Sequence, residues 1–295
     1  MKKPRLLIIG CGDVVRRALP WLVQRFTVYA TARSYESSLQ LNTLGVKVIR
    51  ADLDQPQTIS RLSGLAQYLI HSAPPGAGQG DPRTRALIAA LGRAPRILPL
   101  RRAVYISTSG VYGDCGGVWI DENAPRRATQ ARSLKRIAAE NQLRQWSRRR
   151  GIALSILRAP GIYAAARLPI ARIQRGDPSI QASEDGFSNL IHADDLAHAL
   201  CLALFRGLPL RAYNIADDAP HPMGDWFDLV ADHHKLPRPA RISREAAQQL
   251  LSPAMLSYLN ESRRIDNTRA KRELGLTLAY PSAEDFFAGN VQIMC

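Results

Sequence analysis

The stretch Leu6-Leu7-Ile8-Ile9-Gly10-Cys11-Gly12-Asp13 decides the fold of this chain. A short apolar run of this kind predicts a strand buried on both faces of a parallel sheet. The two glycines after it predict a tight turn into a helix, where backbone approaches a pyrophosphate. The third glycine position of this fingerprint holds Val15. The motif is therefore incomplete, but its place between a strand and a helix predicts a dinucleotide site.

Arg33 stands 21 residues after Gly12, at the end of the second predicted strand. A residue at this distance usually meets the adenine ribose, where Asp or Glu would accept from a free 2′-hydroxyl. Arginine instead offers a planar cationic fork to a phosphate. We therefore expect the cofactor to be NADP rather than NAD. The expected cofactor-binding residues follow strands or open the first helix: Gly10, Gly12, Asp13, Val14, Arg33, Asp52, Leu53, Ser72 and Ala73.

Short apolar runs alternate along the chain with segments of helical length. The runs predict strands over 6–9, 27–31, 46–49, 68–71, 103–107 and 153–157, and helices over 14–25, 84–91 and 132–149. This alternation predicts the α/β class, with a Rossmann-type doubly wound parallel sheet. We place the dinucleotide-binding domain at residues 1–160. A smaller substrate-binding lobe is expected over 161–295, with a strand and a helix returning to the sheet.

The composition limits the class of protein. The chain has 295 residues, of which 46% are hydrophobic and only 6% aromatic, so aliphatic side chains must supply most of the core. Its four cysteines lack Cys-x-x-Cys spacing, so we expect neither a metal site nor a disulfide framework. No signal peptide is recognisable, and no apolar run reaches the roughly 18 residues that a membrane span needs. We expect a cytoplasmic protein that does not associate with membranes.

The net charge of +15 is high, and part of it is concentrated. Nine basic residues and a single acid, Glu140, lie between Arg126 and Arg150. Such a field attracts polyanions, but a solvated face of an arginine-rich chain has the same composition. No nucleic-acid motif accompanies the charge, so we do not expect nucleic acid as a partner.

Several stretches together resemble the extended short-chain dehydrogenase/reductase superfamily, in particular NAD-dependent epimerase/dehydratase-like proteins. They are residues 106–114, 157–163, 189–197, 213–215 and 266–275. The resemblance implies that Thr108, beside Ser109, binds the substrate oxygen and that Pro160 lies next to the nicotinamide. It also implies that Asp52 contacts the adenosine, and that His192 caps or braces a helix. A homodimer built on the helices that flank the sheet is a further implication.

The resemblance breaks at the residues on which the family's reaction depends. A Tyr-x-x-x-Lys pair is expected on the helix after Thr108, where this chain has Arg132 and Arg136. Shifting the alignment by one residue gives Ala131 and Lys135 instead, and neither choice supplies a tyrosine. A guanidinium effectively never gives up its proton, although it binds phosphate or carboxylate well.

This replacement leads to three expectations. Arg136 holds the nicotinamide ribose or a phosphate, and Arg132 holds an anionic substrate. The proton that the missing tyrosine would supply comes from Tyr163, which lies near the expected nicotinamide position, from water or from the substrate. We therefore expect a small-molecule substrate whose oxygen Thr108 binds.

Three functions fit these observations. The first is an NAD(P)-binding oxidoreductase or epimerase/dehydratase-like enzyme that acts on a hydroxyl or carbonyl carbon of an anionic substrate. The second is a non-catalytic NADP(H)-binding sensor or scaffold, which the loss of the Tyr-Lys pair favours. The third is a polyanion binder that uses the basic segment.

Overall fold

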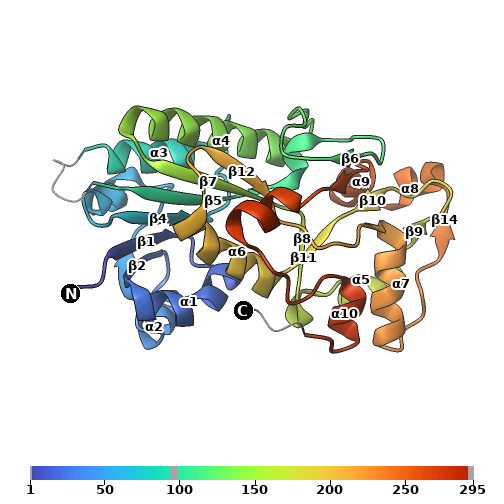
Figure 1. Cartoon of the computed structure of the whole chain (residues 1–295). Coiled ribbons are helices and arrows are strands. Elements are labelled where there is room, and N and C mark those ends of the chain that lie inside the picture. Colours follow the sequence, from blue (N-terminus) through green and yellow to red (C-terminus); the bar gives the residue numbers. More distant parts are fainter. Residues whose placement is uncertain (1, 94–98, 292–295) are drawn as a thin grey trace.

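The computed structural model describes residues 2–93 and 99–291 and is built on a seven-stranded sheet (Figure 1). The strands run in the order β12-β7-β5-β4-β1-β2-β3, and every neighbouring pair is parallel. This is the predicted doubly wound α/β sheet. The strands are β1 (Arg5–Ile9), β2 (Thr27–Ala32), β3 (Lys47–Arg50), β4 (Tyr68–His71), β5 (Arg102–Thr108), β7 (Ala153–Ala159) and β12 (Arg211–Asn214).

Helices cover both faces of the sheet (Figure 1). The side chains of β1 alternate between them, because successive residues of a strand point in opposite directions. Leu6 and Ile8 pack in the core under α1 (Asp13–Arg25), α2 (Tyr35–Thr43) and α6 (Ala193–Arg206). Leu7 and Ile9 pack in the core under η1 (Pro56–Leu62), α3 (Pro82–Leu91) and α4 (Ala131–Arg150). The predicted strands and helices around this sheet are confirmed, with ends shifted by at most two residues.

Polar residues set the helix ends that the sequence pattern predicts. Asp81 caps α3, since its carboxylate accepts from the backbone N–H of Arg83 at 3.1 Å and of Thr84 at 3.3 Å. The side chain of His192 accepts from the N–H of Asp194 at 3.2 Å and caps α6, so its predicted capping role is confirmed. Helix α4 ends at Gly151 with φ of +65°, a conformation that favours glycine.

No helix in the described part of the chain is long and apolar enough to cross a bilayer.

The smaller lobe lies at the carboxyl edge of the sheet and consists of short elements (Figure 1). Four two-stranded pairings hold it together: β8–β11, β10–β13, β9–β14 and β6–β15. β12 belongs to the sheet and α6 packs against it, although both come from the second half of the chain, and the predicted domain boundary at residue 160 stays a prediction. The remaining elements are η2 (Ser109–Tyr112), β6 (Trp119–Ile120), β8 (Gly161–Tyr163), η3 (Ala165–Arg167), α5 (Ile170–Gln174), β9 (Ser179–Ile180), β10 (Phe187–Ser188), β11 (Leu190–His192), β13 (His221–Pro222), α7 (Met223–His233), β14 (Arg241–Ile242), α8 (Arg244–Leu250), α9 (Pro253–Leu259), β15 (Arg264–Ile265), η4 (Ala270–Leu274) and α10 (Ala283–Phe287).

A buried ion pair joins α4 to the sheet. Glu140 is 0% exposed and accepts two hydrogen bonds from Arg158, at 3.1 and 2.8 Å, and one from the Ser107 hydroxyl at 2.7 Å. Arg158 also donates to the Tyr112 hydroxyl at 2.9 Å, which in turn donates to Asn214 at 2.7 Å. Tyr112 is therefore part of a buried network rather than of a surface site, and this network connects β5, β7, β12 and α4.

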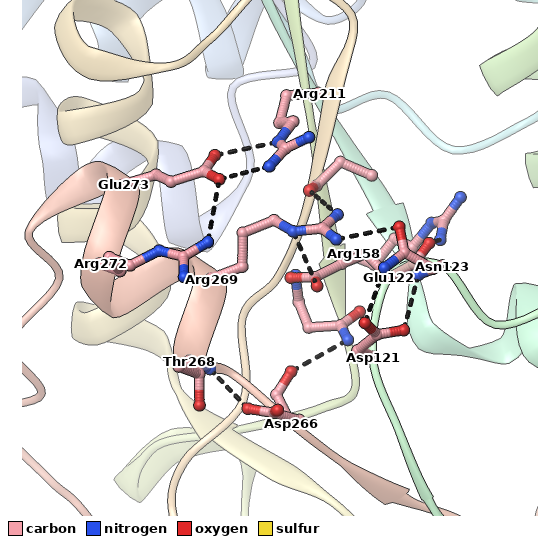
Figure 2. Close-up of polar contacts among 12 residues, drawn as sticks. Asp121, Glu122, Asn123, Arg158, Arg211, Asp266, Thr268, Arg269, Arg272 and Glu273 are labelled. Atoms are coloured by element: carbon pink, nitrogen blue, oxygen red, sulfur yellow. Dashed lines mark hydrogen bonds and ion pairs between the residues drawn. The ribbon is translucent and has the colours of Figure 1, made fainter.

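Further charged pairs tie the C-terminal segment to the sheet (Figure 2). Arg269 lies 3.3 Å from the Glu122 carboxylate and donates to the Asn123 side chain at 3.0 Å. Glu273, in η4, accepts two hydrogen bonds from Arg211 of β12, at 3.0 and 2.5 Å. The segment around η4 is thereby fixed both to the last strand and to the loop that precedes α4.

The buried pair gives the first prediction. Glu140→Ala leaves the Arg158 guanidinium buried without its carboxylate, so we expect a loss of about 3–5 kcal/mol in unfolding free energy. Urea denaturation measures it, and the exposed Glu36→Ala is the control, with a change within about 0.5 kcal/mol. A loss below about 1 kcal/mol for Glu140→Ala would contradict this role.

The same pair predicts a pH dependence. Burial raises the pKa of Glu140, but the hydrogen bonds and charge of Arg158 outweigh it and lower the pKa below its usual value. The ionised Glu140 therefore contributes to the unfolding free energy at any pH above the pKa that it has in the unfolded chain. This contribution is lost as the pH falls through the pKa of Glu140 in the folded protein. In Glu140→Ala, the unfolding free energy should therefore fall less steeply with acidification than in the wild type.

Candidate functional site

Two cavities lie along the carboxyl edge of the sheet. The first, which we call the glycine-turn cavity, has a volume of about 690 Å³ and is lined by the ends of β1, β2, β3 and β4. The second, the lobe cavity, has a volume of about 730 Å³ and lies between the sheet edge and the smaller lobe. Pro74 lines both cavities. The two cavities are therefore neighbours along this edge.

The glycine turn fits a pyrophosphate. Gly10 has φ of +85°, and a Cβ on it would lie 2.6 Å from the backbone nitrogen of Ala73. A Cβ on Gly12 would meet no atom within 4 Å, because this glycine borders the open cavity. Gly12 also precedes the first turn of α1 without a side-chain cap. The N-terminus of α1 thus offers unpaired N–H groups and its positive dipole end to an anion.

Three arginines line the glycine-turn cavity. Arg33 is exposed, and no hydrogen bond or ion pair joins it to another described residue. Arg16 donates to the Cys11 carbonyl and to Gln40, both at 3.2 Å. Arg83 is paired with Asp54 through two hydrogen bonds, which lower the pKa of that carboxyl. Arg33 is therefore the arginine most available to an incoming phosphate.

The structure brings most of the predicted cofactor residues together. The glycine-turn cavity is lined by Gly10, Gly12, Arg33, Asp52, Leu53, Ser72 and Ala73. Asp13 and Val14 are not among its lining residues, because Asp13 pairs with Arg17 and Arg167 and Val14 is buried in the core. Asp13 and Val14 are near the site only because they form the first turn of α1.

Some further residues line the glycine-turn cavity without having been predicted from the sequence. Arg16 lies four residues after Gly12, one helical turn into α1, and that spacing is the signal that could have identified it. Ser34 and Ser37 line the cavity from the start of α2, a helix that was not predicted. Ser34 caps α2 by accepting from the N–H of Ser37 at 3.1 Å.

Thr108 and Ser109 line the lobe cavity at the end of β5. The Thr108 hydroxyl oxygen accepts from the N–H of Gly110 at 3.1 Å and caps η2. Its own proton stays available, since a hydroxyl both accepts and donates. Ser109 is buried, so Thr108 is the more accessible of the two.

Arg136 lies where the cavities meet. It lines the lobe cavity and donates to the Ile106 carbonyl at 3.0 Å and to the Tyr105 hydroxyl at 2.9 Å. A longer contact of 3.4 Å reaches the carbonyl of Ala73, which lines the other cavity. Burial and then the Arg136 charge lower the pKa of nearby His71 to about 4, so this imidazole is neutral. Arg136 and Pro160 are thus both placed at the lobe cavity.

Arg132 is held by the smaller lobe. It donates to the Ser257 hydroxyl at 2.8 Å, and its guanidinium carbon lies 3.7 Å from the centre of the Tyr258 ring. Lys135, one turn further along α4, donates to the Gly76 carbonyl at 2.9 Å. Helix α4 therefore presents Arg132, Lys135 and Arg136 to one cavity.

Tyr163 lines the lobe cavity but is tightly packed. It is 2% exposed, and its hydroxyl donates to the Ser282 carbonyl at 3.3 Å. Its ring contacts those of His192, Trp226 and Phe286. Burial raises the pKa of this phenol far above its usual value. The geometry favours a packing role over the proton-donor role that the sequence analysis considered.

Comparison with known proteins gives a family match over most of the chain. The model of the NAD dependent epimerase/dehydratase family matches residues 21–216. The glycine turn precedes the matched range, and its identification rests on its own geometry. Comparison with curated proteins found no significant match.

Solved structures share the whole fold. A functionally unknown conserved protein from Silicibacter pomeroyi DSS is 28% identical, with a TM-score of 0.79 and coverage of 98% of this chain and 96% of that chain. A putative NAD-dependent epimerase/dehydratase from Methylobacillus flagellatus is 24% identical, with a TM-score of 0.72 and 97% coverage of both chains. UDP-glucuronic acid 4-epimerase from Bacillus cereus, solved with UDP-glucuronic acid and NAD, is 16% identical, with a TM-score of 0.74 and 97% coverage of both chains.

The two glycines give the second prediction. Gly12→Glu meets open space, so unfolding free energy should stay within about 0.5 kcal/mol of the wild type. Its carboxylate repels a pyrophosphate, so NADP⁺ affinity should fall about 100-fold or more in calorimetry.

Gly10→Ala is the matched comparison. Its left-handed backbone costs about 1–2 kcal/mol for any other residue, and the approach to Ala73 adds to this cost. We expect a loss of at least about 1 kcal/mol in urea denaturation. Full stability of Gly10→Ala, or unchanged binding by Gly12→Glu, would contradict this account of the turn.

Proposed function

The chain belongs to the NAD dependent epimerase/dehydratase family, and from that premise we propose that it binds NADP(H) and acts on a hydroxyl or carbonyl carbon of a small anionic substrate. The observation that carries the proposal is that the two cavities adjoin at Pro74, which lines both of them. The glycine-turn cavity would hold the adenosine and pyrophosphate. The lobe cavity, with Thr108 in its wall, would hold the nicotinamide and the substrate.

The preference for a 2′-phosphate is supported by the residues after β2. Arg33 is exposed and lacks a partner among the described residues, and Ser34 and Ser37 stand beside it at the N-terminus of α2. A planar guanidinium and two hydroxyls suit a phosphate ester. The B. cereus epimerase was solved with NAD, so the 2′-phosphate preference is proposed for this chain alone.

The charge of the lobe cavity supports an anionic substrate. Five basic residues and one acid line it: Arg132, Lys135, Arg136, Arg167, Arg263 and Glu261. Glu261 lies 2.8 Å from Arg263, so its negative charge is already neutralised by an ion pair. The stacked Arg132 keeps further N–H groups in the plane of its guanidinium for a carboxylate or phosphate.

In a hydride-transfer reaction, the residues of the lobe cavity would have separate roles. The nicotinamide, when bound, supplies or accepts the hydride. Thr108 would donate a hydrogen bond to the substrate oxygen, stabilising negative charge that develops there. Arg132 would bind the anionic end of the substrate. Arg136, fixed by Tyr105 and the Ile106 carbonyl, would mark the ribose position between the cavities.

A non-catalytic NADP(H) sensor or scaffold is the second candidate. The observation that favours it is the pair Arg132 and Arg136, which occupies α4 and cannot exchange protons at working pH. Such a protein would bind NADPH tightly and turn over no carbonyl substrate, whereas an enzyme would oxidise NADPH with at least one.

The cofactor preference gives the third prediction. Removing a charged phosphate contact costs about 1.5–3 kcal/mol, so Arg33→Ala should weaken NADPH binding about 10- to 100-fold and leave NADH binding unchanged. Thermal-shift titrations with each nucleotide measure this, since stabilisation follows ligand concentration over the dissociation constant.

The exposed Arg61→Ala is the matched control, because it removes an equal charge outside both cavities. It should change neither affinity. Tighter binding of NADH by the wild type, with no effect of Arg33→Ala, would remove the support for NADP.

Thr108 gives the fourth prediction. Thr108→Val keeps the shape of the side chain but removes the hydroxyl, so NADPH oxidation should fall about 100- to 1000-fold, as for the loss of one oxyanion donor. Thr108→Ser keeps the hydroxyl and should retain most of the activity. Equal turnover by the valine and serine variants would show that the Thr108 hydroxyl does not contribute to the reaction.

A further inference from the structure

The lobe cavity needs a proton donor if the proposed function is catalytic. Adding hydride to a carbonyl carbon leaves negative charge on its oxygen, which a nearby acid must neutralise. The arginines of the cavity cannot do so, because a guanidinium keeps its proton. Four described side chains in the cavity wall have protons that exchange more readily: Lys135, Tyr163, Tyr258 and Glu261.

Three of these four are already engaged. Lys135 donates to the Gly76 carbonyl at 2.9 Å, and Tyr163 donates to the Ser282 carbonyl at 3.3 Å. Glu261 accepts a hydrogen bond from Arg263 at 2.8 Å, and its side chain is 7% exposed. A carboxylate in an ion pair has no proton to donate. Each of the three thus already has a hydrogen-bond or ion-pair partner in the described chain.

Tyr258, in contrast, has a hydroxyl without a hydrogen-bond partner in the described chain. It lies on α9 of the smaller lobe and is 53% exposed. No described residue makes a hydrogen bond to its hydroxyl. Its ring is nevertheless fixed, because the Arg132 guanidinium stacks on its face at 3.7 Å. A cation over an aromatic face is an attractive, orienting contact, so the phenol is positioned while its O–H stays unpaired.

We propose that Tyr258 is the proton donor of the lobe cavity, with Arg132 as the residue that positions its ring. Helix α4 contributes Lys135, whose ammonium is held by the Gly76 carbonyl, and two arginines that keep their protons. The smaller lobe would supply the proton donor from the opposite wall, facing the cavity that Thr108 also lines. This inference rests on the proposed function, because it needs a nicotinamide cofactor in the cavity.

The step balances for a carbonyl reduction. The carbonyl carbon would take a hydride, with its electron pair, from a bound reduced nicotinamide, which would thereby be oxidised. The C=O π bond breaks, and the oxygen takes the proton of the Tyr258 hydroxyl to form the alcohol. Water then returns a proton to the phenolate. Thr108 donates a hydrogen bond to the same oxygen throughout.

Tyr258→Phe tests the proposal with little risk to folding, because the half-exposed ring and its stacking on Arg132 are kept. NADPH oxidation with pyruvate, oxaloacetate and dihydroxyacetone phosphate should fall about 100- to 10 000-fold in this variant, the usual contribution of an acid. NADP⁺ affinity should stay unchanged in calorimetry. Tyr280→Phe, outside both cavities, is the control and should keep full activity.

A crystal structure of the wild type with NADP⁺ gives a readout that needs no turnover. One substrate oxygen must reach both hydroxyls within about 3 Å, so the oxygens of Tyr258 and Thr108 should lie no more than about 6 Å apart beside the nicotinamide. A larger separation overturns the proposal, as does full activity of Tyr258→Phe or a loss of activity in Tyr163→Phe alone. Absence of NADP⁺ binding to the wild type overturns the proposed function itself, and this inference with it.

Discussion

The site depends on the close approach of two backbones at the end of β1 and β4. A Cβ on Gly10 would lie 2.6 Å from the nitrogen of Ala73, so only glycine lets the chain turn there. This turn sends the backbone through Gly12 into α1 and leaves open space beside the helix N-terminus. The same contact places Ser72 and Ala73 in the wall of the glycine-turn cavity. The anion site is thus a consequence of how two neighbouring parallel strands end.

The second half of the site depends on how the smaller lobe is attached. Glu140 and Arg158 are buried together and connect α4 to β7, while Arg211 and Glu273 connect β12 to η4. Helix α4 provides Arg132 to the wall of the lobe cavity, and α9 of the smaller lobe provides Tyr258. The stack between these two side chains, together with the hydrogen bond from Arg132 to Ser257, joins α4 to α9. The buried pair of Glu140 and Arg158 thus holds the helix that supplies three basic residues to the lobe cavity.

The sequence predicts what local patterns encode. Apolar runs predicted the six strands 5–9 to 153–159, and the glycines and Arg33 predicted one cavity, because residues that follow parallel strands meet at one edge. Helix α2 was missed, since its sequence Tyr35–Thr43 has few apolar residues. Tyr258 and Glu261 also escaped prediction. Their place in the lobe cavity follows from the fold of the smaller lobe, whose short elements carry no periodic signal.

The central claim is that a nicotinamide dinucleotide binds along the carboxyl edge, with its pyrophosphate at the glycine turn. Isothermal titration of the full chain with NADP⁺ and NAD⁺ tests it most directly. We expect saturable heat for one site per chain, with the phosphorylated nucleotide bound more tightly. No heat from either nucleotide at saturating concentration would contradict it, and would leave the fold without the function proposed for it.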